Sequence, residues 1–286
     1  MFGFLNIYKP KGLTSHDVVA RLRRVSKFKQ IGHTGTLDPL AEGVLPIAFG
    51  KATRLIEYLK EDKAYIAELD FGKISDTYDI EGVVEKFSDK KVVKEQVVEA
   101  LTFFEGEVDQ IPPAYSAVHY NGKRLYELAR EGIIPNDIPK RKVVINKIQL
   151  IDFNESLQTA KIEIECSKGT YIRSIVNDLG QNIASGAVMT ALTRTKSGLF
   201  TIDNSVQLDS ISDADVVKSF LLNPVDVLSY QQYDLSEAQM DKVQHGQSLL
   251  CELFEQDEFV CLVFKNNLCA LAQKQIDKLV TKKVFI

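Results

Sequence analysis

Residues 30–49 read QIGHTGTLDPLAEGVLPIAF, a glycine-rich loop that runs into an apolar strand. Within this stretch, residues 30–43 contain three glycines and a proline, a composition that is typical of loops. Residues 44–49 form a short apolar run, which predicts a buried strand. We therefore expect a constrained loop that ends at the edge of a buried sheet.

The segments on both sides of this stretch mix helical and extended patterns. Residues 15–27 begin with Ser, His and Asp and repeat apolar residues at helical spacing, which predicts a helix. The outer face of this helix would carry four cations, Arg21, Arg23, Arg24 and Lys27. Residues 52–60 predict a second helix, and residues 64–71 alternate like a strand with Tyr65 on its apolar face.

Further along the chain, helices and strands remain mixed. The sequence predicts helices over 94–104, 125–130 and 170–184, and a pair of strands over 142–153 and 159–167. After Pro224 the pattern changes to short apolar runs, so we expect two domains, residues 1–225 and a small β-rich domain over 226–286. Because the elements follow no regular βαβ alternation, the predicted fold class is α+β.

The composition describes an ordinary globular protein. The chain has 286 residues, of which 45% are hydrophobic and 26% charged, and its net charge is −4. A mildly acidic chain is not expected to coat itself with nucleic acid by bulk charge. No apolar run reaches the about 18 residues that a membrane span needs, and the N-terminus lacks a signal-peptide pattern. We therefore expect a cytoplasmic protein.

The small net charge hides a strong pattern along the chain. Residues 1–60 carry a net charge of about +6 and residues 116–202 about +4, whereas 61–115 and 203–286 are acidic. The two basic blocks could form one positive face, as RNA-binding proteins have. Alternatively, each block is only a solvated surface.

The cysteines, the histidines and the glycine-rich loop indicate neither a metal site nor a cofactor site. The four cysteines form no C-x-x-C pair, and no histidine stands at ligand spacing from them. The loop matches neither of the nucleotide-binding glycine motifs, and the chain contains no nucleophile elbow and no H-E-x-x-H motif. We therefore expect a reaction that needs no metal and no cofactor.

Four side chains could carry chemistry. Asp38 lies on the stiff loop before a proline, from which a carboxylate can project into a cleft. Arg173 falls in the first turn of a predicted helix, where a cation is unfavourable unless an anion meets it. Tyr65 and Tyr171 lie on or next to strand ends, where an aromatic face could stack on a base. Each also has a structural alternative: a turn residue, a surface arginine and core tyrosines. Together they suggest a cleft for a nucleotide within RNA.

Several long segments resemble the bacterial tRNA pseudouridine-55 synthases, the TruB family. GHTGTLDPLAEGVLP (32–46) is similar to the catalytic motif of that family. Five further segments fit the family in order and spacing, namely NIYKPKGLTS (6–15), KAYIAELDFG (63–72), PPAYSAV (112–118), KGTYIRSIVNDLG (168–180) and ALTRTKSG (191–198). The resemblance covers about residues 5–200 and is less distinct in the C-terminal stretch.

The resemblance implies the chemistry of the site. Asp38 corresponds to the nucleophile of the family, which helps to detach uracil from its ribose so that the base can turn and rejoin through C5. A cationic neighbour favours the ionised carboxylate that this step needs, and Arg173 matches the arginine that pairs with it. Tyr65 matches the residue that stacks on the flipped uracil and is implicated in a proton transfer.

The resemblance also implies binding roles and a fold. Tyr171 and Leu192 match residues that line the base pocket, and His33 matches the side chain that replaces the flipped nucleotide in the stack. Lys9, with Pro10, matches a motif that supports the catalytic loop. The family's fold is a mixed, largely antiparallel sheet with flanking helices, followed by a small PUA-like domain that binds RNA.

The implied function is isomerisation of uridine to pseudouridine at position 55 in the T-loop of tRNA, by a monomer that binds the T-arm. Two alternatives stay open. Asp38 could act with a second carboxylate in a hydrolase, although Glu42 and Asp178, two acids in the motif segments, have no reason to face it. The protein could also bind or fold tRNA without catalysis, in which case replacing Asp38 would have no effect.

Overall fold

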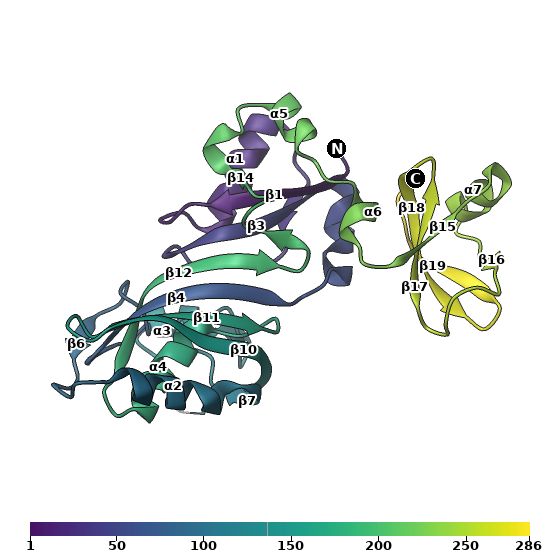
Figure 1. Ribbon diagram of the computed structural model, residues 1–286. Coiled ribbons are helices and arrows are strands. Elements are labelled where there is room, and N and C mark those ends of the chain that lie inside the picture. Colours follow the sequence, from purple (N-terminus) through teal and green to yellow (C-terminus); the bar gives the residue numbers. More distant parts are fainter. Residues whose placement is uncertain (136) are drawn as a thin grey trace.

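The structure is a computed structural model, and it describes residues 1–135 and 137–286. These residues form one ten-stranded sheet, one five-stranded sheet and two ribbons of two strands each. Figure 1 shows the five-stranded sheet beside one end of the large sheet, after a connecting segment that contains the short helix α6 (Pro224–Val227). The termini of the chain lie on the side where the two sheets approach each other.

The large sheet has the strand order β14-β1-β3-β12-β4-β11-β10-β7, with β2 paired to β3 and β13 to β12. Its strands are β1 (Gly3–Lys9), β2 (Ile31–His33), β3 (Ala41–Phe49), β4 (Lys63–Phe71), β7 (Gly106–Gln110), β10 (Arg141–Asn154), β11 (Thr159–Cys166), β12 (Ala187–Ser197), β13 (Phe200–Thr201) and β14 (Val206–Gln207). Neighbouring strands are antiparallel except for β1 with β14 and β3 with β12. The predicted mixed, largely antiparallel sheet of an α+β fold is confirmed.

The sequence of β4 explains its central place in the sheet. Tyr65, Ala67, Leu69 and Phe71 alternate along the strand and all are buried, which confirms the predicted apolar face. β4 pairs with β11 on one side and with β12 on the other. The predicted strand pair after residue 141 is also confirmed, since β10 and β11 are antiparallel neighbours.

Helices cover the large sheet. α1 (Ser15–Ser26) begins with a capping box at Thr14, and α4 (Ile172–Asn182) buries the predicted apolar stripe. α4 and α2 (Lys94–Leu101) pack on the same face of the sheet (Figure 1). The other helices are short: α3 (Leu125–Arg130), α5 (Ala214–Ser219), α7 (Glu237–Gln244) and the 3₁₀ helices η1 (Gly50–Tyr58), η2 (Thr102–Phe104) and η3 (Leu208–Ser210). Within residues 1–135 and 137–286, no helix has both the length and the apolar character needed to cross a membrane.

Three local predictions are corrected by the structure. Residues 30–43 are not loop throughout, because β2 pairs with the far end of β3 and thereby becomes a strand. The predicted helix over 52–60 is the 3₁₀ helix η1. Tyr171 is the N-cap of α4 and does not lie next to a strand end, because β11 ends five residues earlier, at Cys166.

The five-stranded sheet has the order β15-β17-β18-β19-β16. Its strands are β15 (Gln231–Asp234), β16 (Leu249–Leu250), β17 (Phe259–Phe264), β18 (Asn267–Gln275) and β19 (Lys278–Val284). The sheet packs against η1, where Lys51 Nζ donates to the carbonyl oxygen of Phe285 (2.9 Å) and Tyr230 Oη donates to that of Tyr58 (2.9 Å). Apolar side chains from both sheets share one buried cluster at this junction.

The two ribbons lie in the segments that connect the main strands. They are β5 (Lys73–Ser75) with β6 (Val84–Lys86), and β8 (His119–Tyr120) with β9 (Lys123–Arg124). The first ribbon brings residues 76–83 close to β12, since Ile80 N donates to the carbonyl oxygen of Met189 (3.0 Å). This contact places residues 76–83, which lie outside the motif segments, beside the middle of the sheet.

Candidate active site

Arg194 fixes the loop that carries Asp38. Arg194 lies on β12 and is fully buried, without an ion pair to any residue that the structure describes. Its guanidinium donates instead to the carbonyl oxygens of Val44 (2.7 Å), Gly35 (3.1 Å) and Thr36 (3.5 Å). Because a buried guanidinium must keep its hydrogen-bond acceptors, these contacts hold the backbone of the loop against β12.

The segment after β1 holds the other side of the same loop. Leu37 N donates to Ser15 Oγ (2.8 Å), and Gly12 N donates to the carbonyl oxygen of Pro39 (2.8 Å). Lys9 is fully buried, and its ammonium donates to the carbonyl oxygens of Pro10 (3.0 Å) and Leu13. Burial lowers the pKa of Lys9 to about 8. Lys9 thus stabilises the turn that contacts the Asp38 loop, a geometry that fits the supporting role implied for it.

Arg173 and Asp38 meet in an ion pair. Arg173 is the second residue of α4 and its side chain is 7% exposed, so it is not the surface arginine of the structural alternative. Its Nη2 lies 3.0 Å from Asp38 Oδ2, and the Asp38 side chain remains 38% exposed. Arg173 also donates to the carbonyl oxygens of Thr77 (3.1 Å) and Tyr115 (3.3 Å). The cation is therefore fixed from several directions, and the carboxylate stays accessible.

A second carboxylate, that of Asp79, lies behind Arg173. Asp79 Oδ2 is 3.5 Å from Arg173 Nε, and the Asp79 side chain is only 3% exposed. Asp79 Oδ1 accepts from Thr77 Oγ1 (2.6 Å) and from Glu81 N (3.0 Å). Since a buried charge needs both a counterion and hydrogen bonds, Asp79 and Arg173 stabilise each other. The order Asp79–Arg173–Asp38 runs from the interior to the surface.

The ion pair opens into a cavity of 330 Å³. Its wall includes Asp38, Asp79, Arg173, Glu81 and Tyr115. Burial, together with the carboxylates of Asp79 and Asp38, raises the pKa of Glu81. As expected, neither Glu42 nor Asp178 lines this cavity, but two acids from the loop after β5, outside the motif segments, do.

Tyr65 and Leu192 lie on one face of two neighbouring strands. Leu192 on β12 is opposite Ala67 on β4, and Tyr65 is opposite Arg194, so the pleat places all four side chains on one side. Tyr65 is 7% and Leu192 6% exposed. Burial raises the pKa of Tyr65, which keeps its phenol protonated at neutral pH. Both residues lie outside the cavity at Asp38.

Tyr171 and His33 come from two other elements, the N-cap of α4 and the strand β2. The backbone of Tyr171 is clamped by Gln110, whose amide accepts from Tyr171 N (2.7 Å) and donates to Tyr171 O (2.9 Å). His33 ends β2, and its Nδ1 is buried without a hydrogen-bond partner in the described part of the chain. Burial and the charge of Arg194 lower the pKa of His33, which keeps the ring neutral at physiological pH.

Comparison with known families covers most of the chain. The profile of the TruB family pseudouridylate synthase N-terminal domain matches residues 23–172. The profile of the tRNA pseudouridylate synthase B C-terminal domain matches residues 173–228. The chain belongs to the TruB family. All predicted site residues except Lys9 fall within these two matches.

Relatives and solved structures agree with this family. Proteins named tRNA pseudouridine synthase B are 43% identical in Clostridium tetani (83% of this chain, 82% of the relative), 44% in Synechocystis sp. (87% and 86%) and 41% in Heliobacterium mobile (95% and 89%). The fold is similar to a chain of an H/ACA RNP bound to a substrate RNA containing 2′-deoxyuridine, with a TM-score of 0.74 at 22% identity. A chain of a Cbf5-Nop10-Gar1 complex gives 0.74 at 24% identity. Both cover 100% of this chain and 85% of their own, and they support the fold alone.

Three residues of this candidate site were not predicted from the sequence. Arg194 belongs to the quoted ALTRTKSG segment. The alternating pattern of a strand does not predict that its guanidinium contacts a loop that is distant in the sequence. Gln110 lies two residues before the quoted PPAYSAV segment and gives no signal of its own. Asp79 lies outside every quoted segment, and only the fold of the first ribbon brings it to Arg173. An acid between the KAYIAELDFG and PPAYSAV segments was no usable signal, because residues 61–115 carry a large excess of acids.

The candidate site can therefore present the Asp38 carboxylate to a ligand. Asp38 is accessible and has the fixed cation of Arg173 on one side. The loop that carries it is held by Arg194, Ser15 and Gly12, so the carboxylate needs little reorganisation to meet a reacting atom. Such a group can act as a nucleophile or a base.

Proposed function

We propose that this chain isomerises uridine to pseudouridine in tRNA, at position 55 in the T-loop, with Asp38 as the catalytic carboxylate. The observation that carries the proposal is the accessible Asp38 in an ion pair with the buried Arg173, in a chain of the TruB family. Relatives named tRNA pseudouridine synthase B, aligned over most of the chain, supply the substrate class.

The reaction needs a group that assists the exchange of one bond for another. The bond between N1 of uracil and C1′ of the ribose breaks, the base turns, and a bond between C5 and C1′ forms. C5 loses a proton and N1 gains one, so the product is an isomer and no electrons are exchanged with a partner. An ionised Asp38 would act on the ribosyl-uracil unit as nucleophile or base, and this chain's residues would need no metal or cofactor for that step.

The remaining predicted residues would bind the base and the RNA. Tyr65, Tyr171 and Leu192 would surround the uracil, and His33 would occupy the gap that it leaves. Extruding a base costs a few kcal/mol, and stacking on one aromatic side chain can return about 1–3 kcal/mol. In support of this role, Tyr65 lies on the same face of the sheet as Leu192.

The proposal also covers the rest of the chain. We assign residues 1–225 to a catalytic domain and residues 226–286 to a small PUA-like domain that contributes to tRNA binding, with the protein acting as a cytoplasmic monomer. In support, the five-stranded sheet begins at Gln231, shortly after the proposed boundary. The larger sheet carries Tyr65 and Leu192, and its flanking segments carry Asp38 and Arg173.

One observation favours a second candidate, an Asp-dependent hydrolase. Glu81 lines the cavity with Asp38, and its raised pKa suits a general acid. The products distinguish the two reactions, because a hydrolase releases free uracil and leaves an abasic site, whereas the isomerase retains the base. Chromatography of the reaction mixture for free uracil, beside mapping of pseudouridine in the RNA, decides between them. We favour the isomerase because of the family.

Binding of tRNA should depend strongly on salt. If the basic blocks 1–60 and 116–202 contact the T-arm, the logarithm of the affinity should fall linearly with the logarithm of the salt concentration, with a slope on the order of −3 to −5. Filter binding of unmodified tRNA between dilute and physiological salt measures the slope. An affinity that does not change with the salt concentration would mean that the two blocks are only solvated surfaces.

Replacing His33 should affect base extrusion more than chemistry. We expect His33→Ala to lower the single-turnover rate more on folded tRNA than on an isolated T-arm hairpin, because the hairpin has less stacking and tertiary contact to lose. The ion pair of Asp38 and Arg173 does not involve His33 and should remain. The same rates measured with wild type serve as the reference. An equal loss on both substrates would assign His33 to the chemistry or to the fold of the loop.

A further inference from the structure

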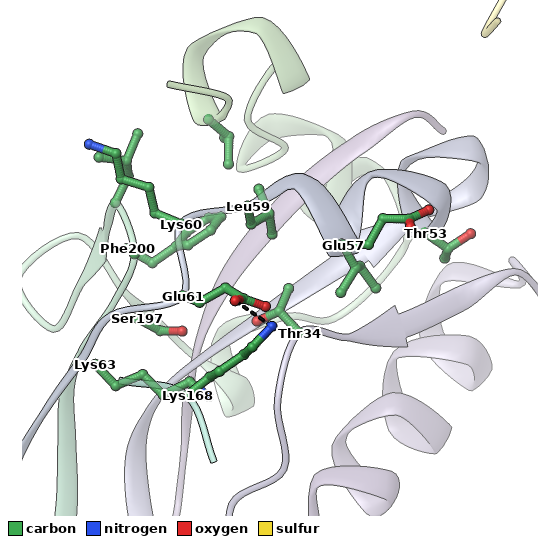
Figure 2. Close-up of a pocket in the computed structure, with 14 residues that line it drawn as sticks. Thr34, Thr53, Glu57, Leu59, Lys60, Glu61, Lys63, Lys168, Ser197 and Phe200 are labelled. Carbon is green, nitrogen blue, oxygen red and sulfur yellow. Dashed lines mark ion pairs between the residues drawn. The ribbon is translucent and has the colours of Figure 1, made fainter. Parts of the chain in front are cut away.

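A second cavity, of 440 Å³, lies where the start of β4, η1 and the turn after β12 meet (Figure 2). Its wall includes Thr34, Glu61, Lys63, Lys168 and Ser197. It shares no lining residue with the cavity at Asp38. Lys63 and Lys168 are the first residues of two segments that carry the family resemblance, yet neither has been given a role so far.

Lys63 brings an unpaired cation to this second cavity. Its ammonium forms no ion pair and no side-chain hydrogen bond with the residues that the structure describes, whereas Lys168 and Lys196 nearby are both paired. Burial and the charge of Arg194 lower the pKa of Lys63. Lys63 and Arg194 both lie close to Gly35 of the loop that carries Asp38. A Cβ atom built on that glycine would lie 3.2 Å from Lys63 Nζ and 3.8 Å from Arg194 Nη1. Two cations thus lie beside the catalytic loop, and neither has a carboxylate partner in the described part of the chain.

An unpartnered hydroxyl faces the same space. Thr34 Oγ1 is buried and has no hydrogen-bond partner among the described residues. Thr34 directly follows His33 and lines the cavity. A buried polar atom without a partner is unfavourable, so a ligand that accepts a hydrogen bond from the hydroxyl would remove that penalty.

The carboxylates in the wall are already neutralised. Glu61 is paired with Lys168 at 2.6 Å, the interaction marked in Figure 2, and Glu57 is paired with Lys283 at 3.0 Å. The charge that remains for a ligand is therefore positive and comes from Lys63 and the exposed Lys60. Ammonium groups and a hydroxyl donor are the chemistry that binds phosphate oxygens.

The second cavity lies close to the residues that would bind the uracil. Lys63 and Tyr65 are two residues apart on β4, so their side chains share a face and are separated by roughly 7 Å along the strand. Thr34 adjoins His33 at the other wall. A strand of RNA that delivers a nucleotide to Asp38 past Tyr65 would bring a neighbouring phosphate to Lys63.

We propose that this second cavity binds a backbone phosphate of the substrate RNA, next to the nucleotide that enters the Asp38 site, through Lys63 and Thr34. The inference rests on the proposed function, because it takes RNA as the substrate. It also explains why an unpaired cation is kept beside Arg194: the RNA supplies the missing anion. Lys63 is in this view a binding residue and takes no part in bond exchange.

The first test removes the cation. Lys63→Met keeps most of the length of the side chain, and we expect it to weaken T-arm binding about tenfold and to make the salt slope about one unit less steep. Lys218→Met, on the distant α5, is the matched control, because it removes the same charge from an exposed lysine and should change the affinity less than about twofold. Thermal unfolding should show Lys63→Met folded, since it removes a charge that has no partner. A wild-type affinity and slope for Lys63→Met would overturn the proposal.

The second test neutralises the phosphate. T-arm hairpins with a single methylphosphonate, placed in turn at each linkage around the target uridine, remove one negative charge at a time. We expect one position to weaken binding by wild type about tenfold and to have no further effect on Lys63→Met. Equal losses in both proteins at every position would contradict the assignment. A different result would show that the cavity is a site for a free anion and that the RNA assignment is wrong. In that case inorganic phosphate raises the unfolding temperature of wild type but not of Lys63→Met, and no methylphosphonate changes the RNA affinity.

The assays separate this inference from the proposed function. Pseudouridine formation is measured with the same proteins at saturating concentration, where a defect in binding no longer limits the rate. If wild type forms no pseudouridine, the proposed function fails, and the salt slope and the methylphosphonate series still decide the phosphate site. If wild type forms pseudouridine and Lys63→Met binds RNA as wild type does, only the phosphate site is wrong.

Discussion

Asp38→Asn should abolish turnover and leave tRNA affinity within roughly tenfold of wild type, or about 1.4 kcal/mol. Asn has nearly the size and polarity of Asp but lacks the negative charge and the nucleophilic oxygen. Because Asp38 is 38% exposed, the substitution should leave the fold intact. Single-turnover formation of pseudouridine and equilibrium binding of tRNA, measured on the same preparation, test both halves of the prediction.

The affinity measurement is the control for this variant. A protein that binds tRNA normally and forms no pseudouridine has lost chemistry alone. Residual activity above about a thousandth of wild type would contradict the assignment of Asp38 as the catalytic carboxylate. A protein that merely binds or folds tRNA would show no change in that function after Asp38→Asn.

Removing Arg173 should cost both stability and activity. Arg173→Met leaves the buried carboxylate of Asp79 without its cation, and breaking a buried pair in this way typically costs 3–5 kcal/mol, on the order of a third of a domain's stability. The exposed Asp38 also loses its fixed counterion, so we expect activity to fall at least about a hundredfold. Thermal or urea unfolding and single-turnover rates measure the two effects.

A double variant separates the two roles of Arg173. Arg173→Met combined with Asp79→Asn removes both buried charges, and Asn still accepts the hydrogen bonds from Thr77 and Glu81. We expect the double variant to regain most of the lost stability and none of the lost activity. Recovery of activity along with stability would show that Arg173 acts only through the fold and not on Asp38.

The regular parts of the fold followed from short-range patterns. β4 was predictable because Tyr65 and Leu69 belong to an unbroken alternation, and α4 because Ile175 and Leu179 lie on one stripe. β2 was not predictable, since a three-residue segment with a central glycine becomes a strand only by pairing with the end of β3. η1 read as an α-helix because the apolar spacing of nine residues does not distinguish the two helix types.

Site residues were predictable only where the residue type and its local sequence context together suggested a chemical role. Asp38 stood out as a carboxylate on a constrained loop, and Arg173 as a cation at the wrong end of a helix. The structure gives the physical reason for the second, because Arg173 is balanced by two carboxylates instead of solvent. Asp79 and Arg194 were missed because their roles depend on contacts that span 94 and about 158 residues of sequence, which no local pattern encodes.

The most direct test of the central claim is to map pseudouridine in an unmodified tRNA transcript after incubation with the purified wild-type protein and, in parallel, with Asp38→Asn. Chemical derivatisation followed by primer extension locates pseudouridine at single-nucleotide resolution. We expect one new pseudouridine, at position 55 of the T-loop, with wild type and none with Asp38→Asn. A transcript that remains unmodified with wild type, or that carries the new pseudouridine with Asp38→Asn as well, would contradict it.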